Sequence, residues 1–236
     1  MKMVANQKDT LSFLVYLDEW IQKIPMKKLD DLVQPPDKTA IVCVDVTKGF
    51  CYVGPLSSPR VASIVNPIVD LMKNAWQAGV QNIILSQDAH EPEAVEFGSW
   101  PPHCIRGTEE ADTVDEIRNL PFFEKMLVLE KNSIASGLNN DLQQWVIDHT
   151  EVENYIVVGD CTDLCTYQLA MFLRLDANER QIFRHVIVPE NCVQTYDMSV
   201  ETAQQIGAYA HPGDLIHSFF LYHMALNGIE VVRAIE

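Results

Sequence analysis

Short apolar runs alternate with amphipathic stretches along the chain from Thr39 onward. The strand-like runs are TAIVCVDV, QNIILS, MLVLEK, NYIVVGD, HVIVPEN and IEVVRAI. Between them, apolar residues recur at helical spacing over 61–76, and further helices are expected near 141–149 and over about 162–175. Apolar runs of strand length that are separated by helices predict a parallel sheet covered by helices on both faces.

The residues before Thr39 follow a different pattern. Apolar positions recur at helical spacing between residues 10 and 32, and the sequence QPP at 34–36 ends this stretch. A chain of 236 residues is within the range of one domain. We therefore expect a helical N-terminal extension and linker over 1–38 and one domain over 39–236. The extension either covers a neighbouring subunit or packs on its own sheet.

The net charge narrows the range of partners. The chain carries 17 Lys and Arg against 33 Asp and Glu, which gives a net charge of -16. Nucleic acids and anionic membranes are bound by clusters of basic residues, so the sequence argues against both. No apolar run approaches the ~18 residues that span a bilayer, and Asp18 and Glu19 interrupt the N-terminal stretch. We expect neither a membrane span nor a signal peptide.

The cysteine content favours a reducing, cytoplasmic setting. The spacing of the cysteines does not match that of small secreted scaffolds held by disulfides. Several lie in apolar runs, where a reduced thiol packs as a small hydrophobic group. The six residues are Cys43, Cys51, Cys104, Cys161, Cys165 and Cys192.

Chemically reactive residues follow four of the expected strands. Asp45 follows the first strand, Asp88 with His90 the second, Lys131 ends the third, and the turn GDCTDLC, with Cys165, follows the fourth. In open α/β sheets, ligands bind beyond the carboxyl ends of the strands. These positions are therefore the first candidates for a site.

Cys165 is the candidate nucleophile. It is expected near the start of a helix, where the helix dipole can lower a thiol pKa and backbone N–H groups can bind an oxyanion. Asp45 would serve as an acid/base carboxylate, and Lys131 as a cation beside both groups. Taken singly, each has a plainer interpretation: a buried cysteine, a turn-forming aspartate and a surface lysine.

Asp88, His90 and His103 are candidate metal ligands. Asp88 and His90 are two positions apart, so in an extended segment they project to the same side, and His103 follows after a loop. One carboxylate and two imidazoles suit Zn, Fe or Mn. The alternative is a polar loop with a capped turn. The remaining histidines are interpreted as structural or solvent-facing: His149, His185, His211, His217 and His223.

Taken together, VDVTKGF, SQDAH, WPPHCIRGT, LEKNSIASG and VVGDCTDLC resemble the motifs of nicotinamidases of the isochorismatase-like hydrolases, in matching order. The sequence AHP at 210–212 is similar to the plant-type members. The resemblance implies a three-layer α/β/α sandwich with a mostly parallel six-stranded sheet. It also implies a catalytic triad of Asp45, Lys131 and Cys165, and a possible homo-oligomer.

The resemblance further implies how the site binds its metal and substrate. One divalent ion would be held by Asp88, His90 and His103, with Glu96 as an optional ligand and Glu91 and Glu93 as its rivals. Phe50 and Trp100 would flank the substrate ring. The backbone N–H groups of Cys161 and Cys165 would bind the oxyanion, beside a cis peptide at Asp160-Cys161. Asp163 is interpreted as a helix-start carboxylate.

The implied reaction converts nicotinamide and water to nicotinate and ammonia through a Cys thioester, as in the salvage of NAD. Two alternatives stay open. The chain could be another small-amide or carbamoyl hydrolase of the same superfamily, or a catalytically silent binding homologue.

Overall fold

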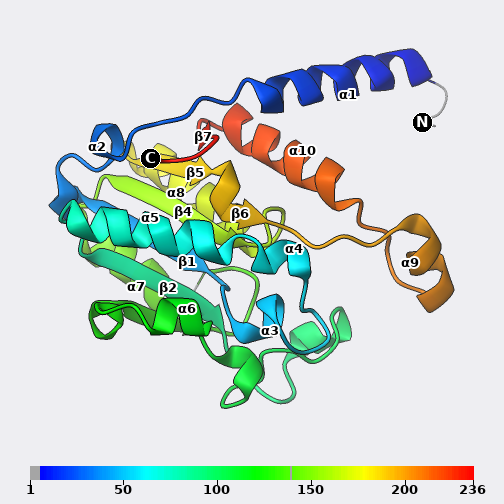
Figure 1. Ribbon diagram of the computed structural model, residues 1–236, viewed down its shortest axis with the longest axis horizontal. Helices are drawn as coiled ribbons and strands as arrows, with labels where there is room; N and C mark the ends of the chain where they lie inside the picture. The colour runs from blue at the N-terminus through cyan, green and yellow to red at the C-terminus, as the bar shows by residue number, and fades with distance from the viewer. Residues whose placement is uncertain (1–5, 139) are drawn as a thin grey trace.

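The computed structural model describes residues 6–138 and 140–236, and its centre is a parallel sheet (Figure 1). Six strands lie in the order β3-β2-β1-β4-β5-β7, and the short strand β6 pairs with β4 off this path. All strand pairs are parallel. The strands are β1 (Thr39–Val44), β2 (Asn82–Asp88), β3 (Leu127–Lys131), β4 (Asn154–Asp160), β5 (His185–Pro189), β6 (Val193–Gln194) and β7 (Glu230–Val232). The predicted parallel sheet is confirmed.

Helices cover both faces of this sheet, as predicted. One face packs against α5, whose apolar side includes Ile68, Met72 and Ala75, and against the shorter helices α3, α4 and α6. The other face packs against α7, α8 and α10. Their bounds are α3 (Lys48–Cys51), α4 (Pro59–Ala62), α5 (Val65–Gln77), α6 (Asp115–Arg118), α7 (Asp141–Asp148), α8 (Cys165–Arg180), α9 (Val200–Ile206) and α10 (Gly213–Leu226).

Short 3-10 helices lie in several of the connecting segments. They are η2 (Pro36–Lys38), η3 (Val95–Gly98), η4 (Glu109–Ala111), η5 (Phe123–Lys125) and η6 (Glu190–Cys192). Within the described part of the chain, no helix is long and apolar enough to cross a membrane. All six cysteines are free thiols.

The N-terminal extension packs against α10 of its own chain, and coverage of a neighbouring subunit stays a prediction. It contains α1 (Gln7–Gln22) and α2 (Leu29–Leu32) rather than one continuous helix. Figure 1 shows α1 lying alongside α10, where Phe13 and Trp20 place their rings 5.8 and 5.3 Å from Tyr222. The backbone between the two helices then pairs with the last residues of the chain, through Lys27 and Ile235.

The strand order creates a switch point between β1 and β4. The chain adds β2 and β3 on one side of β1, and then crosses to add β4 and β5 on the other. Because every strand runs in the same direction, the carboxyl ends of β1 to β4 meet at one edge of the sheet. Ligands of open α/β sheets bind at such a point.

Candidate active site

Two strand ends and one helix start bring the predicted catalytic side chains together. Asp45 follows β1 directly, Lys131 is the last residue of β3, and Cys165 is the first residue of α8. All three are at most 5 % exposed. Asp45 has a φ of 56°, a left-handed conformation that is uncommon outside glycine and often occurs at functional sites.

Lys131 is the centre of four ionisable side chains, here called the lysine-centred group: Lys131, Asp45, Asp88 and Cys165. Its Nζ lies 2.7 Å from Asp45 Oδ2 and 2.5 Å from Asp88 Oδ1. The same ammonium donates to Cys165 Sγ at 3.7 Å. The backbone N–H of Asp88 donates to Asp45 Oδ1 at 2.8 Å. Two buried carboxylates and a thiol thus share one cation.

This sharing makes Asp45 a stronger base than an ordinary carboxylate. Burial raises the pKa of Asp45 to about 6, and Asp88 adds to the effect while Lys131 opposes it. Burial also disfavours the ionised form of Asp88, but Lys131 and two imidazoles outweigh it and hold its pKa below the usual range. Asp45 is therefore the better base of the two carboxylates at neutral pH.

The Cys165 thiol behaves differently from the sequence-based expectation. Burial raises its pKa well above the usual value, and Asp45 and Asp88 add to this effect, while Lys131 lowers it. The expectation of a lowered pKa at the helix start is therefore wrong, because desolvation outweighs the favourable charges. The raised pKa favours the neutral thiol of Cys165 in the resting site.

The nucleophile turn, residues 160–165, joins β4 to α8 and contains a cis peptide bond at Asp160-Cys161, as the resemblance implied. Gly159 precedes it with a φ of 115°, and a Cβ there would lie 2.0 Å from the carbonyl oxygen of Val44. Only glycine permits this approach. Within the described residues, neither the Cys161 nor the Cys165 backbone N–H has an acceptor. Both can donate to a ligand oxygen.

Asp88, His90 and His103 form a second group next to the first. Their potential ligand atoms all lie within 4.8 Å of one another, and all three side chains are buried. The Nε2 atoms of His90 and His103 lie 3.4 and 3.7 Å from Asp88 Oδ2. A backbone bridge between His90 and Ile105 holds the two loops together.

The hydrogen bonds of the two imidazoles fit a metal ion. His90 Nδ1 faces the Asn132 Oδ1 at 3.1 Å, and this oxygen also accepts a backbone N–H. His103 Nδ1 faces the carbonyl oxygen of Pro101 at 2.8 Å. Both Nδ1 atoms therefore donate, so each Nε2, when it carries no proton, offers a lone pair near Asp88 to a metal ion. His90 Nε2 is buried with no hydrogen-bond partner among the described residues.

Glu96 lies outside this set of three, but the structure favours it over its rivals. One of its oxygens accepts the Ile134 N–H at 3.2 Å, and the other is buried with no hydrogen-bond partner among the residues described. Glu91 and Glu93 are exposed. Glu96 stays a prediction as an optional ligand.

The two predicted ring-binding residues differ in their surroundings. The buried Phe50 ring lies 5.5 Å from the His103 ring. Trp100 instead lies edge-on to Tyr196 at 6.4 Å. Phe97, which the sequence pattern did not single out, contacts both imidazoles at 5.3 and 5.7 Å. The sandwich of a substrate ring between Phe50 and Trp100 stays a prediction.

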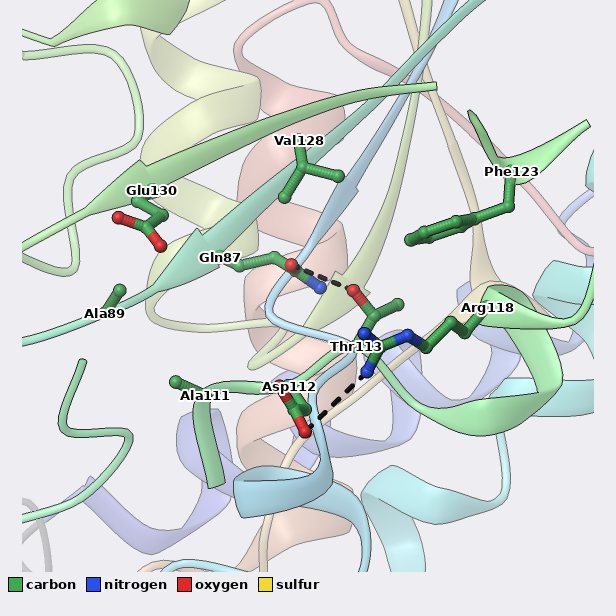
Figure 2. A pocket seen from close by; sticks show the side chains of 9 residues that line it. All are labelled: Gln87, Ala89, Ala111, Asp112, Thr113, Arg118, Phe123, Val128 and Glu130. Carbon is green, nitrogen blue, oxygen red and sulfur yellow. Dashed lines mark hydrogen bonds and ion pairs between the residues drawn. The ribbon is translucent and has the colours of Figure 1, made fainter. Parts of the chain in front are cut away.

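A polar hollow of about 210 Å³, whose lining side chains are drawn in Figure 2, is separate from the predicted catalytic and metal-binding residues. Successive side chains of a strand point to opposite faces, so Gln87 of β2 lines this hollow while Asp88 points to the metal group. None of the predicted catalytic or metal-binding residues lines it. The lining residues are Gln87, Ala89, Ala111, Asp112, Thr113, Arg118, Phe123, Val128 and Glu130.

Asp163 does not cap α8, which corrects the interpretation made from sequence. The helix has no side-chain cap. Asp163 instead pairs with His211 Nε2 at 2.9 Å and accepts from Thr195 Oγ1 at 2.6 Å. No local spacing signal marks these contacts, because the partners lie far along the chain.

The isochorismatase domain family matches residues 39–216. The chain belongs to this family. Its relatives include Nicotinamidase 1 of Arabidopsis thaliana, which is 27% identical over 241 residues, covering 93% of this chain and 96% of the relative. The resemblance inferred from the motifs is confirmed.

Solved structures share the isochorismatase-like fold. The pyrazinamidase of Pyrococcus horikoshii, solved in complex with zinc, has a TM-score of 0.64 and 20% identity, covering 83% of this chain and 99% of that one. The N-carbamoylsarcosine amidase of Thermoplasma acidophilum has a TM-score of 0.60 and 22% identity, covering 83% and 95%. The predicted fold class and the prediction of an enzyme of this hydrolase family are confirmed.

Proposed function

We propose that this isochorismatase-family chain is an amidohydrolase that converts nicotinamide and water to nicotinate and ammonia. The observation that carries the proposal is the buried Cys165 thiol beside Asp45 and Lys131. The match to a named nicotinamidase over nearly the whole of both chains supports the choice of substrate.

The first half of the reaction forms a thioester. Asp45 accepts the thiol proton, and Cys165 Sγ attacks the carboxamide carbon. The resulting oxyanion accepts hydrogen bonds from the Cys161 and Cys165 N–H groups. Asp45 then returns the proton to the amine nitrogen, the C–N bond breaks, and ammonia leaves.

The second half releases the acid. Asp45, again a carboxylate, takes a proton from water, whose oxygen attacks the thioester carbon. The C–S bond breaks, the proton returns to sulfur, and nicotinic acid departs and ionises to nicotinate in water. Lys131 keeps its charge throughout and stabilises the negative charge on Asp45. Splitting a difficult substitution into two steps is the usual advantage of a covalent nucleophile.

A metal ion would be held by Asp88, His90 and His103, with Glu96 as an additional ligand. A bound divalent ion would supply a Lewis-acid position that orients the substrate next to the thiol. Asn132 and the Pro101 carbonyl fix the rings that face it. The choice among Zn, Fe and Mn belongs to this proposal, and one solved neighbour contains zinc.

Several wider predictions depend on the same function. A nicotinamidase would act in NAD salvage, in a cytoplasmic setting. The division into an extension over 1–38 and a hydrolase domain over 39–236 and the homo-oligomer belong to this proposal too.

A panel of amides tests the substrate. We would measure ammonia release from nicotinamide, pyrazinamide, propionamide and an N-carbamoyl amino acid with the untreated protein. The proposal expects a clear preference for the two aromatic amides. A preference for the carbamoyl compound would favour the other amidase activity, and no release from any amide would favour a silent homologue.

A further inference from the structure

Two histidines hold consecutive residues of the nucleophile turn. His217 Nδ1 lies 2.8 Å from Thr162 Oγ1, and His211 Nε2 lies 2.9 Å from Asp163 Oδ2. His211 and His217, here called the histidine clamp, come from the segment that leads into and forms α10, far in sequence from the turn. Thr162 and Asp163 lie between the two proposed oxyanion donors, so any movement of these residues moves the donors.

His211 is a cation in this arrangement. Its Nδ1 faces the Tyr196 carbonyl oxygen at 2.9 Å, and its Nε2 faces the Asp163 carboxylate. Because both partners accept hydrogen bonds, both ring nitrogens carry a proton. The side chains of His211 and Asp163 are only 11% and 7% exposed, which limits screening of the ion pair by water.

The rest of the clamp is also built from buried contacts. Thr195 is fully buried and donates to the second Asp163 oxygen. The His211 ring stacks on Tyr196 at 3.9 Å, and Tyr196 in turn contacts Trp100. His217 is buried, and its Nε2 lies 3.8 Å from Glu190 Oε1. His211 is thus connected to a predicted wall of the substrate site, whereas His217 connects the turn to Glu190.

We propose that His211 and His217 are positioning residues that fix the nucleophile turn through Asp163 and Thr162. The proposal rests on the amidohydrolase function, because it concerns the oxyanion donors and Cys165. In catalysis, donors act well only when they are held in place before charge develops. Loss of either clamp contact should therefore lower the rate without removing the nucleophile.

The charge on His211 makes its contribution depend on pH. Burial disfavours the cation, but the hydrogen bond and charge of Asp163 outweigh burial and raise the pKa of His211 above its usual value. Burial raises the pKa of Tyr196 to about 12 and that of Cys161 well above its usual value. The other charged groups on the adjoining segments have their own partners: Arg60 with Asp214 and Asp197 with the Gly213 N–H. His211 is therefore the group of this cluster that loses its charge as the pH rises through its raised pKa.

Three histidine-to-glutamine variants test the clamp. Glutamine places a neutral amide near the Nε2 position, so His211→Gln keeps a hydrogen bond to Asp163 but loses the charge. His217→Gln removes the group that reaches Thr162 from Nδ1. His185→Gln is the matched control, because His185 also pairs with a carboxylate, Glu230, at 2.6 Å. It is the first residue of β5 and therefore lies at the edge of the sheet opposite to the candidate site.

The readouts are kcat and KM for nicotinamide between pH 6 and 10, with circular dichroism to confirm folding. We expect both clamp variants to lose kcat by about tenfold or more, within the 10–100-fold range of lost supporting contacts at active sites. KM should rise for His211→Gln alone, because of its link to Trp100. The ratio of wild-type to His211→Gln kcat should be largest near pH 6 and should fall as His211 of the wild type loses its proton.

A second readout is independent of the substrate. The rate of Cys165 alkylation by iodoacetamide, followed by peptide mass spectrometry, should show the same pH-dependent difference between wild type and His211→Gln. If both clamp variants match His185→Gln in kcat and in alkylation rate, the clamp is not a positioning device. Loss of stability with an unchanged pH profile would also overturn the proposal. If the wild type does not hydrolyse nicotinamide, the proposed function fails, and alkylation still decides the clamp.

Discussion

The lysine-centred group and the histidine clamp are both buried and ionic, yet their charges are arranged in opposite ways. In the lysine-centred group, Asp45 and Asp88 compete for one ammonium. In the clamp, Asp163 has its own imidazolium, His211, and a hydroxyl donor as well. The first arrangement leaves a carboxylate with a raised pKa, ready to accept a proton. The second leaves each group satisfied and holds backbone in place.

This difference separates reactive groups from supporting ones within a single site. A buried charge with an incomplete set of partners is costly, and such groups gather where chemistry requires a shifted pKa. A complete pair has little tendency to exchange protons. The contrast predicts different responses to substitution in the two regions.

Removal of the nucleophile should have the largest effect. Cys165→Ala should lower the kcat/KM for nicotinamide by at least about 10⁴-fold, the scale seen when a covalent nucleophile is removed. Cys192→Ala is the matched control, because Cys192 is a buried free thiol outside the lysine-centred group. Ammonia release measures both. Substantial activity in Cys165→Ala would show that the lysine-centred group does not supply the nucleophile.

Removal of the shared cation should have the largest effect on stability. Lys131→Met leaves Asp45 and Asp88 buried without their partner, which should cost about 3–5 kcal/mol in the free energy of unfolding. Urea titration measures this loss. Lys38→Met, at the half-exposed pair of Lys38 with Glu153, should cause little or no loss. If both variants lost the same free energy of unfolding, Lys131 would not be needed to stabilise the two buried carboxylates.

Metal removal tests the predicted metal ligands Asp88, His90 and His103. The untreated protein should contain about one transition-metal ion per chain. Because an ion that binds only the folded state stabilises it by about 2.7 kcal/mol at one hundred times its Kd, chelation should lower the thermal midpoint. His103→Asn should remove both the ion and the chelator response, whereas His149→Asn should preserve them. If the untreated protein contained no appreciable metal, Asp88, His90 and His103 would be a polar network and not a metal site.

The smallest effect should be the pH dependence that the clamp adds to stability. The raised pKa of His211 means that its ion pair stabilises the fold fully below about pH 6.5, the ordinary pKa of histidine. This stabilisation is lost as the pH rises through the raised value. It amounts to about 1.4 kcal/mol for each unit of elevation. Unfolding titrations from pH 6 to 10 should show this loss in the wild type and not in His211→Gln.

Much of the site could be predicted because its residues stand at the ends of apolar runs. Asp45, Asp88 and Lys131 each close a strand whose pattern is visible in the sequence, and parallel strands bring such ends to one edge. His90 follows the second of these strands by two residues, whereas His103 lies in a loop and was proposed with the help of the family motifs. The prediction for the N-terminal extension was less accurate. The segment between α1 and α2 pairs with the last residues of the chain, and such a distant contact leaves no local pattern in the sequence.

Other properties could not be read from the chain. The pKa of Cys165 was expected to be low from its place at a helix start, and burial among two carboxylates reversed that expectation. Asp163 was taken for a helix cap, although its partners are His211 and Thr195. No pattern in the sequence indicated that Trp100 contacts Tyr196.

The sequence by itself determined the parallel sheet, the candidate residues at its carboxyl edge and the family. It could do so because periodicity and strand ends are local properties of a chain. Only the tertiary structure decided which charges share a partner, which proton is mobile and which histidines hold the nucleophile turn. These depend on burial and on distances between residues far apart in sequence, and electrostatic energies change steeply with both.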